Sequence, residues 1–197
     1  SSAAIKRLRA MLTRSGKEDH AERKIFDNHA DPPWRYEQKN RQGSAELHYP
    51  TMSIEEICSL PVADLAAKDS VLFLWATFPQ LPEALKVIKA WGFSYRSVAF
   101  VWIKGTGAPT HGFTVWGIEL EAMQKFALAV KGHPKRKSAG VHQLIVSPIE
   151  RHSKKPDEAR RKIVELMGDI PRVELFAREK KPGWDVWGNE VESTVNL

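Results

Sequence analysis

The segment 70–76, which reads SVLFLWA, constrains the fold of this chain more than any other. Its apolar residues form one continuous run, whereas a strand with one face in water would alternate apolar and polar residues. The sequence therefore predicts a strand that is buried on both faces. Further strands are predicted at 97–104, 125–132 and 142–147. Buried strands of this kind indicate an open, mostly parallel sheet whose two faces are covered.

Predicted helices alternate with these strands. In the stretch 80–92, Leu81, Leu85 and Ile88 are spaced so that they face inward. The stretch 156–168 begins with Pro-Asp-Glu, which favours the first turn of a helix. The alternation predicts an α/β fold with helices on both faces of the sheet.

A shorter helix is predicted within 51–60, which reads TMSIEEICSL. Ser53 can cap its first turn, and Glu56 stands three residues later, as in a capping box. Pro61 is expected to end it.

Ligands of open α/β sheets bind beyond the carboxyl ends of the strands. Three conspicuous segments follow or close predicted strands. The segment 31–34 follows the strand 24–30, a Lys-Gly pair stands at 131–132, and an Ala-Arg pair at 177–178 closes the strand 172–178. The sequence therefore predicts that these three segments share one edge of the sheet.

The 197 residues, 42% of them hydrophobic, are enough for one well-packed domain. We expect a basic N-terminal arm at 1–24, the folded domain at 25–192 and a short tail at 193–197. The chain has 30 Lys and Arg against 24 Asp and Glu, a formal net charge of +6. A positive excess favours polyanionic partners such as nucleic acid.

Several classes of site and location are not expected. Cys58 is the single cysteine, which excludes an internal disulfide and a thiolate metal cluster. The His, Asp and Glu residues lack metal-ligand spacing, so no metal is predicted. No apolar run reaches the length of a membrane span, and no signal-peptide core is present, so we expect a cytoplasmic protein.

The loop at 31–34 brings together Asp31, Pro32, Pro33 and Trp34. Two consecutive prolines fit neither a helix nor a strand interior, so the loop is stiff. A carboxylate, a fixed backbone and a large flat ring therefore stand side by side. Rigid loops with polar and aromatic groups are frequent functional sites.

The Asp-Pro-Pro-Trp sequence at a strand end resembles the signature of methyltransferases that act on the exocyclic amines of bases. Further stretches resemble, in the same order, the adenine methyltransferase family of the messenger-RNA enzymes and their phage and bacterial relatives, the MT-A70 family. The resemblance covers roughly residues 25–192, and the stretches are YPTMS at 49–53, LFLW at 72–75, VWIK at 101–104, VKG at 130–132, SKKPDE at 153–158, VELFAR at 173–178 and WGNE at 187–190.

This resemblance implies a Rossmann-like fold with permuted motif order, in which the catalytic loop comes first and the cofactor-binding strand last. It implies methyl transfer from S-adenosyl-L-methionine to the N6 amine of adenine in nucleic acid, with DNA favoured over RNA, in a bacterial or phage-infected cell. A catalytically silent nucleic-acid-binding subunit remains the alternative, and methylation of the cytosine amine is a third. A homodimer or a heteromer is possible.

The amine of adenine is a poor nucleophile because its lone pair is delocalised into the ring. Acceptors at Asp31 and at a carbonyl of Pro32 or Pro33 can bind its hydrogens, and Trp34 offers a stacking surface. The resemblance implies cofactor contacts for Asp31, Lys131, Phe176, Arg178, Asn189 and Glu190. It implies substrate contacts for Trp34, Tyr49, Trp75, Trp102, Lys104, Ser153, Lys154 and Lys155. The basic stretch GHPKRK at 132–137 is either a phosphate-contacting loop or a solvated loop, and its position beside Lys131 favours phosphate contact.

Two segments depart from the family pattern. Asn28 and His29 stand in a strand that is usually apolar, and Gln124, after Glu119, stands where an acid is expected. Trp75 and Trp102 have an alternative role as plain core residues, because both end apolar strands.

Overall fold

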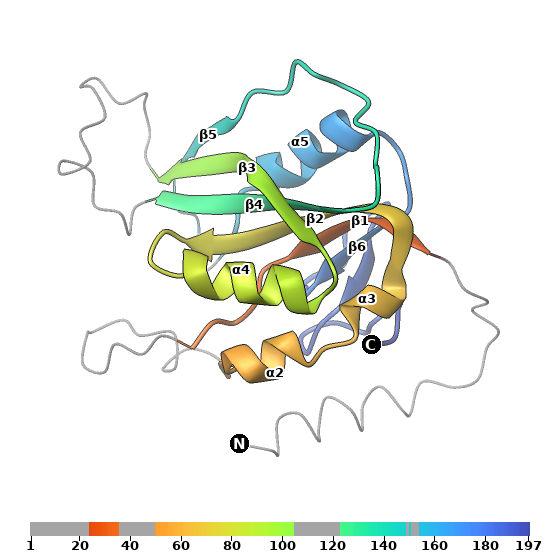
Figure 1. Ribbon diagram of the computed structural model, residues 1–197. Coiled ribbons are helices and arrows are strands. Elements are labelled where there is room, and N and C mark those ends of the chain that lie inside the picture. Colours follow the sequence, from red (N-terminus) through yellow and green to blue (C-terminus); the bar gives the residue numbers. More distant parts are fainter. Residues whose placement is uncertain (1–23, 36–49, 105–122, 149, 151–153) are drawn as a thin grey trace.

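The computed structural model of the chain describes residues 24–35, 50–104, 123–148, 150 and 154–197. Within them lies one seven-stranded sheet with the strand order β5-β3-β4-β2-β1-β6-β7 (Figure 1). The strands are β1 (Ile25–Ala30), β2 (Ala66–Thr77), β3 (Ser94–Lys104), β4 (Met123–Lys131), β5 (Leu144–Ser147), β6 (Arg172–Leu175) and β7 (Asp185–Trp187). The described helices are α2 (Ile54–Cys58), α3 (Val62–Leu65), α4 (Leu81–Ala90) and α5 (Asp157–Met167). None of these helices is long and apolar enough to cross a membrane.

The sheet is mostly parallel, as expected. β1 pairs in parallel with β2 and β6, and the pairs β3–β5 and β6–β7 are also parallel. β4 is antiparallel to both of its neighbours, β2 and β3. Its central place in the sheet explains why its sequence is apolar, because an apolar run reports burial on both faces and not strand direction.

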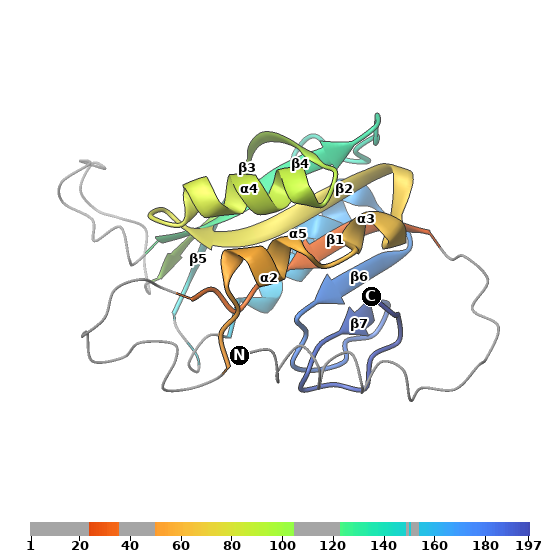
Figure 2. The same ribbon diagram turned by 60° about the horizontal axis from the view of Figure 1, so that its bottom comes forward.

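Helices cover both faces of the sheet, and β2 shows how the sequence is divided between them. Leu72 and Leu74 lie in the core cluster on the side of α4, together with Val87 and Ile88. The alternate residues, of which Phe73 is the central one, lie in a second cluster with residues of α5. Figure 2 shows α2, α3 and α4 on one side of the sheet and α5 on the other. The two layers explain the absence of polar alternation in this strand.

The predicted helices are present, with one correction to an inward face. The capping box of α2 is formed in full: Ser53 accepts from the Glu56 amide, and the Glu56 carboxylate accepts from the Ser53 amide. In α4, Leu85 is 39% exposed, which contradicts its predicted inward position. Ala84 and Ile88 are buried instead, because they lie four residues apart on the face that meets the sheet.

The C-terminal part differs from the sequence prediction in three ways. β6 ends at Leu175, because Phe176 adopts a left-handed backbone with φ of 62°. β7 is a short strand in a stretch for which the sequence analysis predicts no strand. The residues 193–197 do not form a separate tail: the Thr194 amide donates to the Val186 carbonyl at 2.8 Å, and Val195 packs against the core.

Candidate active site

The loop at 31–34 is fixed at the carboxyl end of β1 by backbone hydrogen bonds. The Trp34 amide donates to the Pro32 carbonyl, and the Met52 amide donates to the Pro33 carbonyl, both at 2.8 Å. These bonds add to the restriction that two prolines already place on the backbone. Asp31, directly after β1, is therefore held at the edge where ligands of α/β sheets bind.

The structure gives Trp34 a different environment from the exposed stacking surface expected for it. Its ring is only 4% exposed and belongs to the core cluster on the α4 side of the sheet. Its Nε1–H donates to the Trp75 carbonyl at 3.0 Å. In this conformation Trp34 anchors the loop to the end of β2.

Asp31 forms an ion pair with Lys155, which stands just before α5. The Lys155 ammonium donates to Oδ2 of Asp31 at 2.8 Å, and both side chains are partly buried. The same ammonium lies 5.6 Å from the centre of the Trp75 ring, close enough for a cation–π contact. A carboxylate, an ammonium and an aromatic ring therefore meet at the carboxyl edge of β1 and β2.

Four residues predicted to bind the cofactor lie at the neighbouring ends of β6 and β7. Phe176 packs edge-on against Trp187, with ring centres 5.4 Å apart, and Arg178 Nε lies 3.3 Å from a carboxylate oxygen of Glu190. Asn189 is exposed beside Glu190. These residues share the sheet edge of Asp31, because β6 and β7 run parallel to β1.

The two segments are joined tightly at Gly188. The Ala177 amide donates to the Trp187 carbonyl at 3.0 Å. A Cβ atom on Gly188 would lie 2.3 Å from the Ala177 carbonyl oxygen, so a side chain does not fit. Close packing against the Ala177 backbone therefore explains why the WGNE stretch has a glycine at position 188.

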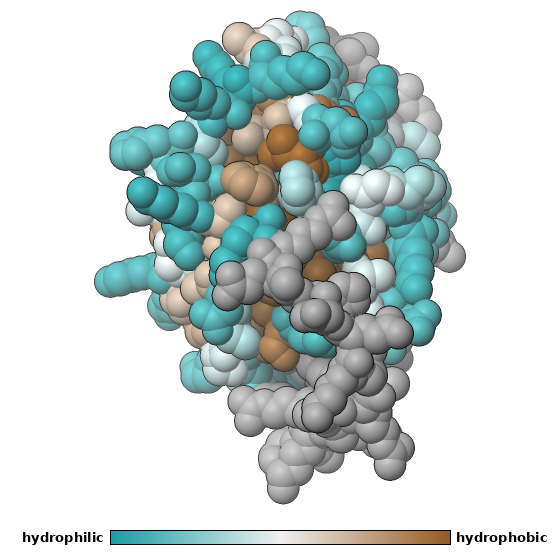
Figure 3. All heavy atoms as spheres, turned by 90° about the vertical axis from the view of Figure 1, so that its right-hand side faces the viewer, coloured by the Kyte–Doolittle hydropathy of each residue, from teal (hydrophilic) through white to brown (hydrophobic). Residues whose placement is uncertain are grey.

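The structure does not bring Lys131 to this edge. Lys131 pairs with Ser70 near the start of β2, and its ammonium donates to the Ala63 carbonyl at 3.1 Å. Because β4 is antiparallel, its carboxyl end lies at the amino ends of the parallel strands. The predicted location of the Lys-Gly pair at 131–132 beside Asp31 is therefore wrong. The basic stretch 132–137 follows β4 at the same opposite edge, where hydrophilic side chains surround apolar ones (Figure 3).

Of the remaining predicted substrate residues, the structure describes the side chains of Trp75, Trp102 and Lys154. Trp75 and Trp102 lie near the carboxyl ends of β2 and β3 with ring centres 6.3 Å apart, and both are buried. The Trp102 Nε1–H donates to the Ser147 carbonyl, whereas the Trp75 Nε1–H has no partner among the described residues. Lys154 stands beside Lys155. Tyr49, Ser153, Glu119 and the side chains of Lys104 and Gln124 lie outside the described residues.

Comparison with known proteins identifies the family of the chain. The sequence model of the MT-A70 family matches residues 29–190, from the end of β1 to the WGNE stretch. The chain belongs to the MT-A70 family. Members of this family are N6-adenine methyltransferases that use S-adenosyl-L-methionine as methyl donor, which gives the enzyme class and the cofactor.

Individual relatives agree with this assignment. The type II methyltransferase M.MunI of Mycoplasma sp is 32% identical over 184 residues, which cover 83% of this chain and 76% of that protein. The human N(6)-adenine-specific methyltransferase METTL4 is 31% identical over 86% of this chain and 38% of its own length. The human N(6)-adenosine-methyltransferase catalytic subunit METTL3 is 28% identical over 83% of this chain and 27% of its own length. The chain thus spans most of M.MunI but well under half of the human relatives.

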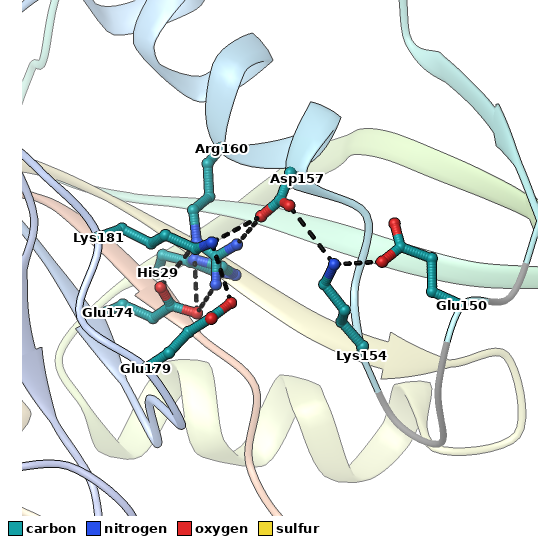
Figure 4. A network of polar contacts seen from close by, with 8 residues as sticks. All are labelled: His29, Glu150, Lys154, Asp157, Arg160, Glu174, Glu179 and Lys181. Atoms are coloured by element: carbon teal, nitrogen blue, oxygen red, sulfur yellow. Dashed lines mark hydrogen bonds and ion pairs between the residues drawn. The ribbon is translucent and has the colours of Figure 1, made fainter.

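This MT-A70 chain also contains a polar network that the sequence analysis missed. Arg160 of α5 binds both carboxylate oxygens of Glu174 in β6, and its third nitrogen binds Asp157 (Figure 4). Glu174 lies in the otherwise apolar stretch VELF, and a charged residue in a buried strand requires a partner. The sequence therefore indicates that Glu174 needs a partner, but it does not identify Arg160 as that partner.

His29 and Asp27 lie beside this network on the same face of β1. Burial lowers the pKa of His29 to about 3, and the nearby Arg160 adds to the effect, so the imidazole is neutral. Burial raises the pKa of Asp27 to about 7 against the opposing effect of Arg172. Neither side chain has a hydrogen-bond partner among the described residues. The departure from the family pattern at His29 is therefore part of a buried polar layer between β1, β6 and α5.

Proposed function

We propose that this chain methylates the N6 amine of adenine in DNA. The observation that carries the proposal is the Asp31–Lys155 pair beside the rigid loop at 31–34. DNA is favoured over RNA because the chain matches a bacterial type II methyltransferase, M.MunI, over 76% of that protein's length. The basic excess of +6 supports a polyanionic substrate.

The residues at this edge fit the methyl donor. The amino-acid end of S-adenosyl-L-methionine carries an ammonium and a carboxylate, and Asp31 and Lys155 supply the two opposite charges 2.8 Å apart. Phe176 offers an apolar ring for the donor's adenine, and Arg178, Asn189 and Glu190 offer hydrogen bonds for its ribose. When bound, the donor supplies a methyl carbon activated by a sulfonium. Lys131 has no part in this arrangement.

Asp31 prepares the nucleophile. Its second carboxylate oxygen, with the second lone pair of a Pro32 or Pro33 carbonyl, accepts the hydrogens of the target amine. These bonds return electron density to the nitrogen. The stiff loop holds both acceptors in place before the base arrives, so little reorganisation is needed. No covalent enzyme intermediate is required.

Trp34 and Trp75 have complementary roles in this proposal. Trp34 anchors the loop through its bond to the Trp75 carbonyl. Trp75 packs beneath the Lys155 ammonium, which lies 5.6 Å from the centre of its ring. Trp75 and Trp102 are as buried as Trp34, so in the described structure they support the site from within the core and are not stacking surfaces for the target base. An adenine in a duplex must first leave the stack, which costs a few kcal/mol.

Labelled methyl transfer tests the function. The protein is incubated with methyl-labelled donor and either double-stranded DNA or RNA, and the product is digested to nucleosides. We expect label in N6-methyladenine from DNA, with Asp31→Asn protein as the blank. Label from RNA alone would overturn the choice of DNA, and label in cytosine would overturn the choice of base.

The silent subunit remains the second candidate, because Gln124 replaces an expected acid. A protein that binds nucleic acid but neither binds the donor nor transfers label would support it. The basic arm at 1–24, the cytoplasmic location and a homodimeric or heteromeric state remain predictions. Size-exclusion chromatography with light scattering, with and without DNA, tests the oligomeric state.

A further inference from the structure

An alternating chain of charges connects β6 to the segment that carries Lys155. It begins at Glu174, whose two oxygens accept from Arg160 Nε at 2.8 Å and from a terminal nitrogen of Arg160 at 2.7 Å. The other terminal nitrogen of Arg160 donates to Asp157 at 2.7 Å. Asp157 lies 3.6 Å from the Lys154 ammonium, and the next residue is Lys155. Figure 4 shows this sequence of contacts from Glu174 to Lys154.

The inner part of the chain of charges is well fixed. Glu174 is buried in β6, and the side chain of Arg160 is 15% exposed. A two-point bond between a guanidinium and a carboxylate fixes direction as well as distance. Arg160 therefore holds the first turn of α5 in a set position over β6.

A second branch reaches the other half of the site. Lys181 lies 3.7 Å from Asp157 and 3.1 Å from Glu179. Glu179 directly follows Arg178, one of the residues proposed for the ribose. The network thus joins the Lys155 segment to the loop after β6.

The helix does not depend on this network for its attachment to the sheet. Ala159, Ile163 and Met167 of α5 pack in the apolar cluster with Phe73. Arg160 fixes the position of the amino end of the helix, where the apolar contacts end.

We propose that Arg160 is a positioning residue for the methyl donor. Through Glu174 and Asp157 it sets the segment 154–155, so that the Lys155 ammonium stands beside Asp31 and meets the donor carboxylate. This inference rests on the proposed function of the Asp31–Lys155 pair.

The first test compares Arg160→Gln with Arg161→Gln. Arg161 is the adjacent residue on α5, and its side chain is 74% exposed and lies 3.5 Å from a carboxylate oxygen of Glu158. Calorimetry measures the Kd for S-adenosyl-L-methionine without nucleic acid. We expect Arg160→Gln to weaken binding about tenfold or more and Arg161→Gln to leave it within twofold. Equal donor affinity of both variants and the unchanged protein would overturn the inference.

A double-mutant cycle separates positioning from general stability. If Arg160 acts through Lys155, Arg160→Gln should weaken donor binding in the unchanged protein but have no further effect in a Lys155→Ala background. A full, independent effect in that background would show that Arg160 acts by another route. In the transfer assay, the KM for the donor should rise while kcat at saturating donor stays within about twofold.

Removal of Arg160 alone leaves Glu174 buried without its partner, and this variant could fail to fold. The charge-balanced variant Arg160→Gln with Glu174→Gln avoids the unpaired carboxylate. Asp157→Asn leaves the Arg160–Glu174 pair intact and weakens the contacts of Asp157 with Arg160, Lys154 and Lys181. Both should weaken donor binding in a protein with a cooperative melting transition, and unchanged Kd in both would refute the inference. Failure of the unchanged protein to bind the donor at all would instead refute the proposed function.

Discussion

The face of the sheet beneath α5 is built in two different ways. Over β2, β4 and β3 it is aromatic and apolar, with Phe73, Phe100 and Phe126 in mutual ring contact. Over β1 and β6 it is polar. The buried side chains there are Asp27, His29, Arg172 and Glu174.

The difference follows the position of the candidate site. The polar half lies in the two strands whose carboxyl ends lead into Asp31 and Phe176. Buried charges and unpaired polar atoms contribute little to stability, whereas aromatic packing contributes much. We therefore expect the apolar half to support the fold and the polar half to set the geometry of the candidate site. Four predictions test this division, from the largest expected effect to the smallest.

Phe73→Ala should be the most destabilising change. The side chain is fully buried among aromatic rings, and such truncations cost about 3–5 kcal/mol. Urea unfolding measures the free energy of unfolding of the variant and of the unchanged protein. Phe26→Ala is the matched control, because Phe26 is 41% exposed on β1, and it should cost far less. Equal losses would contradict a scaffold role for the apolar half.

Asp31→Asn should have the opposite effect: it should reduce activity and leave stability nearly unchanged. Loss of one preorganised acceptor is expected to lower kcat about 10²–10³-fold. The fold should be retained, because the loop is held by its own backbone bonds. Methyl transfer at saturating donor and the melting temperature are measured together. Full activity in a folded variant would remove the carboxylate from the chemistry.

The polar half should also give stability an unusual pH dependence. The pKa of His29 falls from 6.5 to about 3 on folding, so the unfolded chain binds more protons and this contribution is lost as pH falls below 6.5. The pKa of Asp27 rises from 3.8 to about 7, so its contribution is present at low pH and is lost as pH rises from 4 to 7. Between pH 4 and 6.5 the two effects oppose each other.

Asp27→Asn separates these effects. With Asp27 removed, the His29 effect remains alone, and stability should increase more steeply with pH between 4.5 and 6.5 than in the unchanged protein. Urea unfolding at three pH values measures the slope. Glu165→Gln, an exposed change on α5, should leave the slope unaltered. An unchanged slope in Asp27→Asn would mean that Asp27 does not titrate in this range.

The smallest effect is expected from Trp34→Phe. It removes the bond to the Trp75 carbonyl but keeps most of the ring, at a cost of about 1 kcal/mol. Trp91→Phe is its control, because Trp91 donates to the Ile57 carbonyl in the same core cluster, away from the loop. Both should lose similar stability, but only Trp34→Phe should reduce methyl transfer. Equal activity would mean that loop anchoring by Trp34 is dispensable.

Local signals in the sequence predicted much of this structure. Apolar runs located the strands, the Ser53–Glu56 spacing predicted the capping box, and the two prolines predicted a stiff loop beside Asp31. The direction of β4 was not readable, because burial on both faces has the same sequence pattern in either direction. This single ambiguity put Lys131 at the wrong edge.

The site details that escaped prediction depend on contacts between distant segments. The sequence implied that Glu174 needs a partner, but only the packing of α5 on β6 selects Arg160. Likewise, an aromatic residue after two prolines can face solvent or core. The bond from Trp34 to the Trp75 carbonyl decides between them.

The antiparallel direction of β4 places an open surface position, Gly140, in the segment that leaves the sheet at the edge opposite Asp31. β4 runs away from the edge of Asp31 over its nine residues. The exposed segment that follows β4 therefore begins at the opposite edge of the sheet. A methyl group added at Gly140 in that segment would meet no atom within 4 Å, so the position faces open space. A fluorophore or affinity handle inserted there should leave methyl transfer intact, which provides an attachment point for single-molecule studies of the enzyme on its substrate.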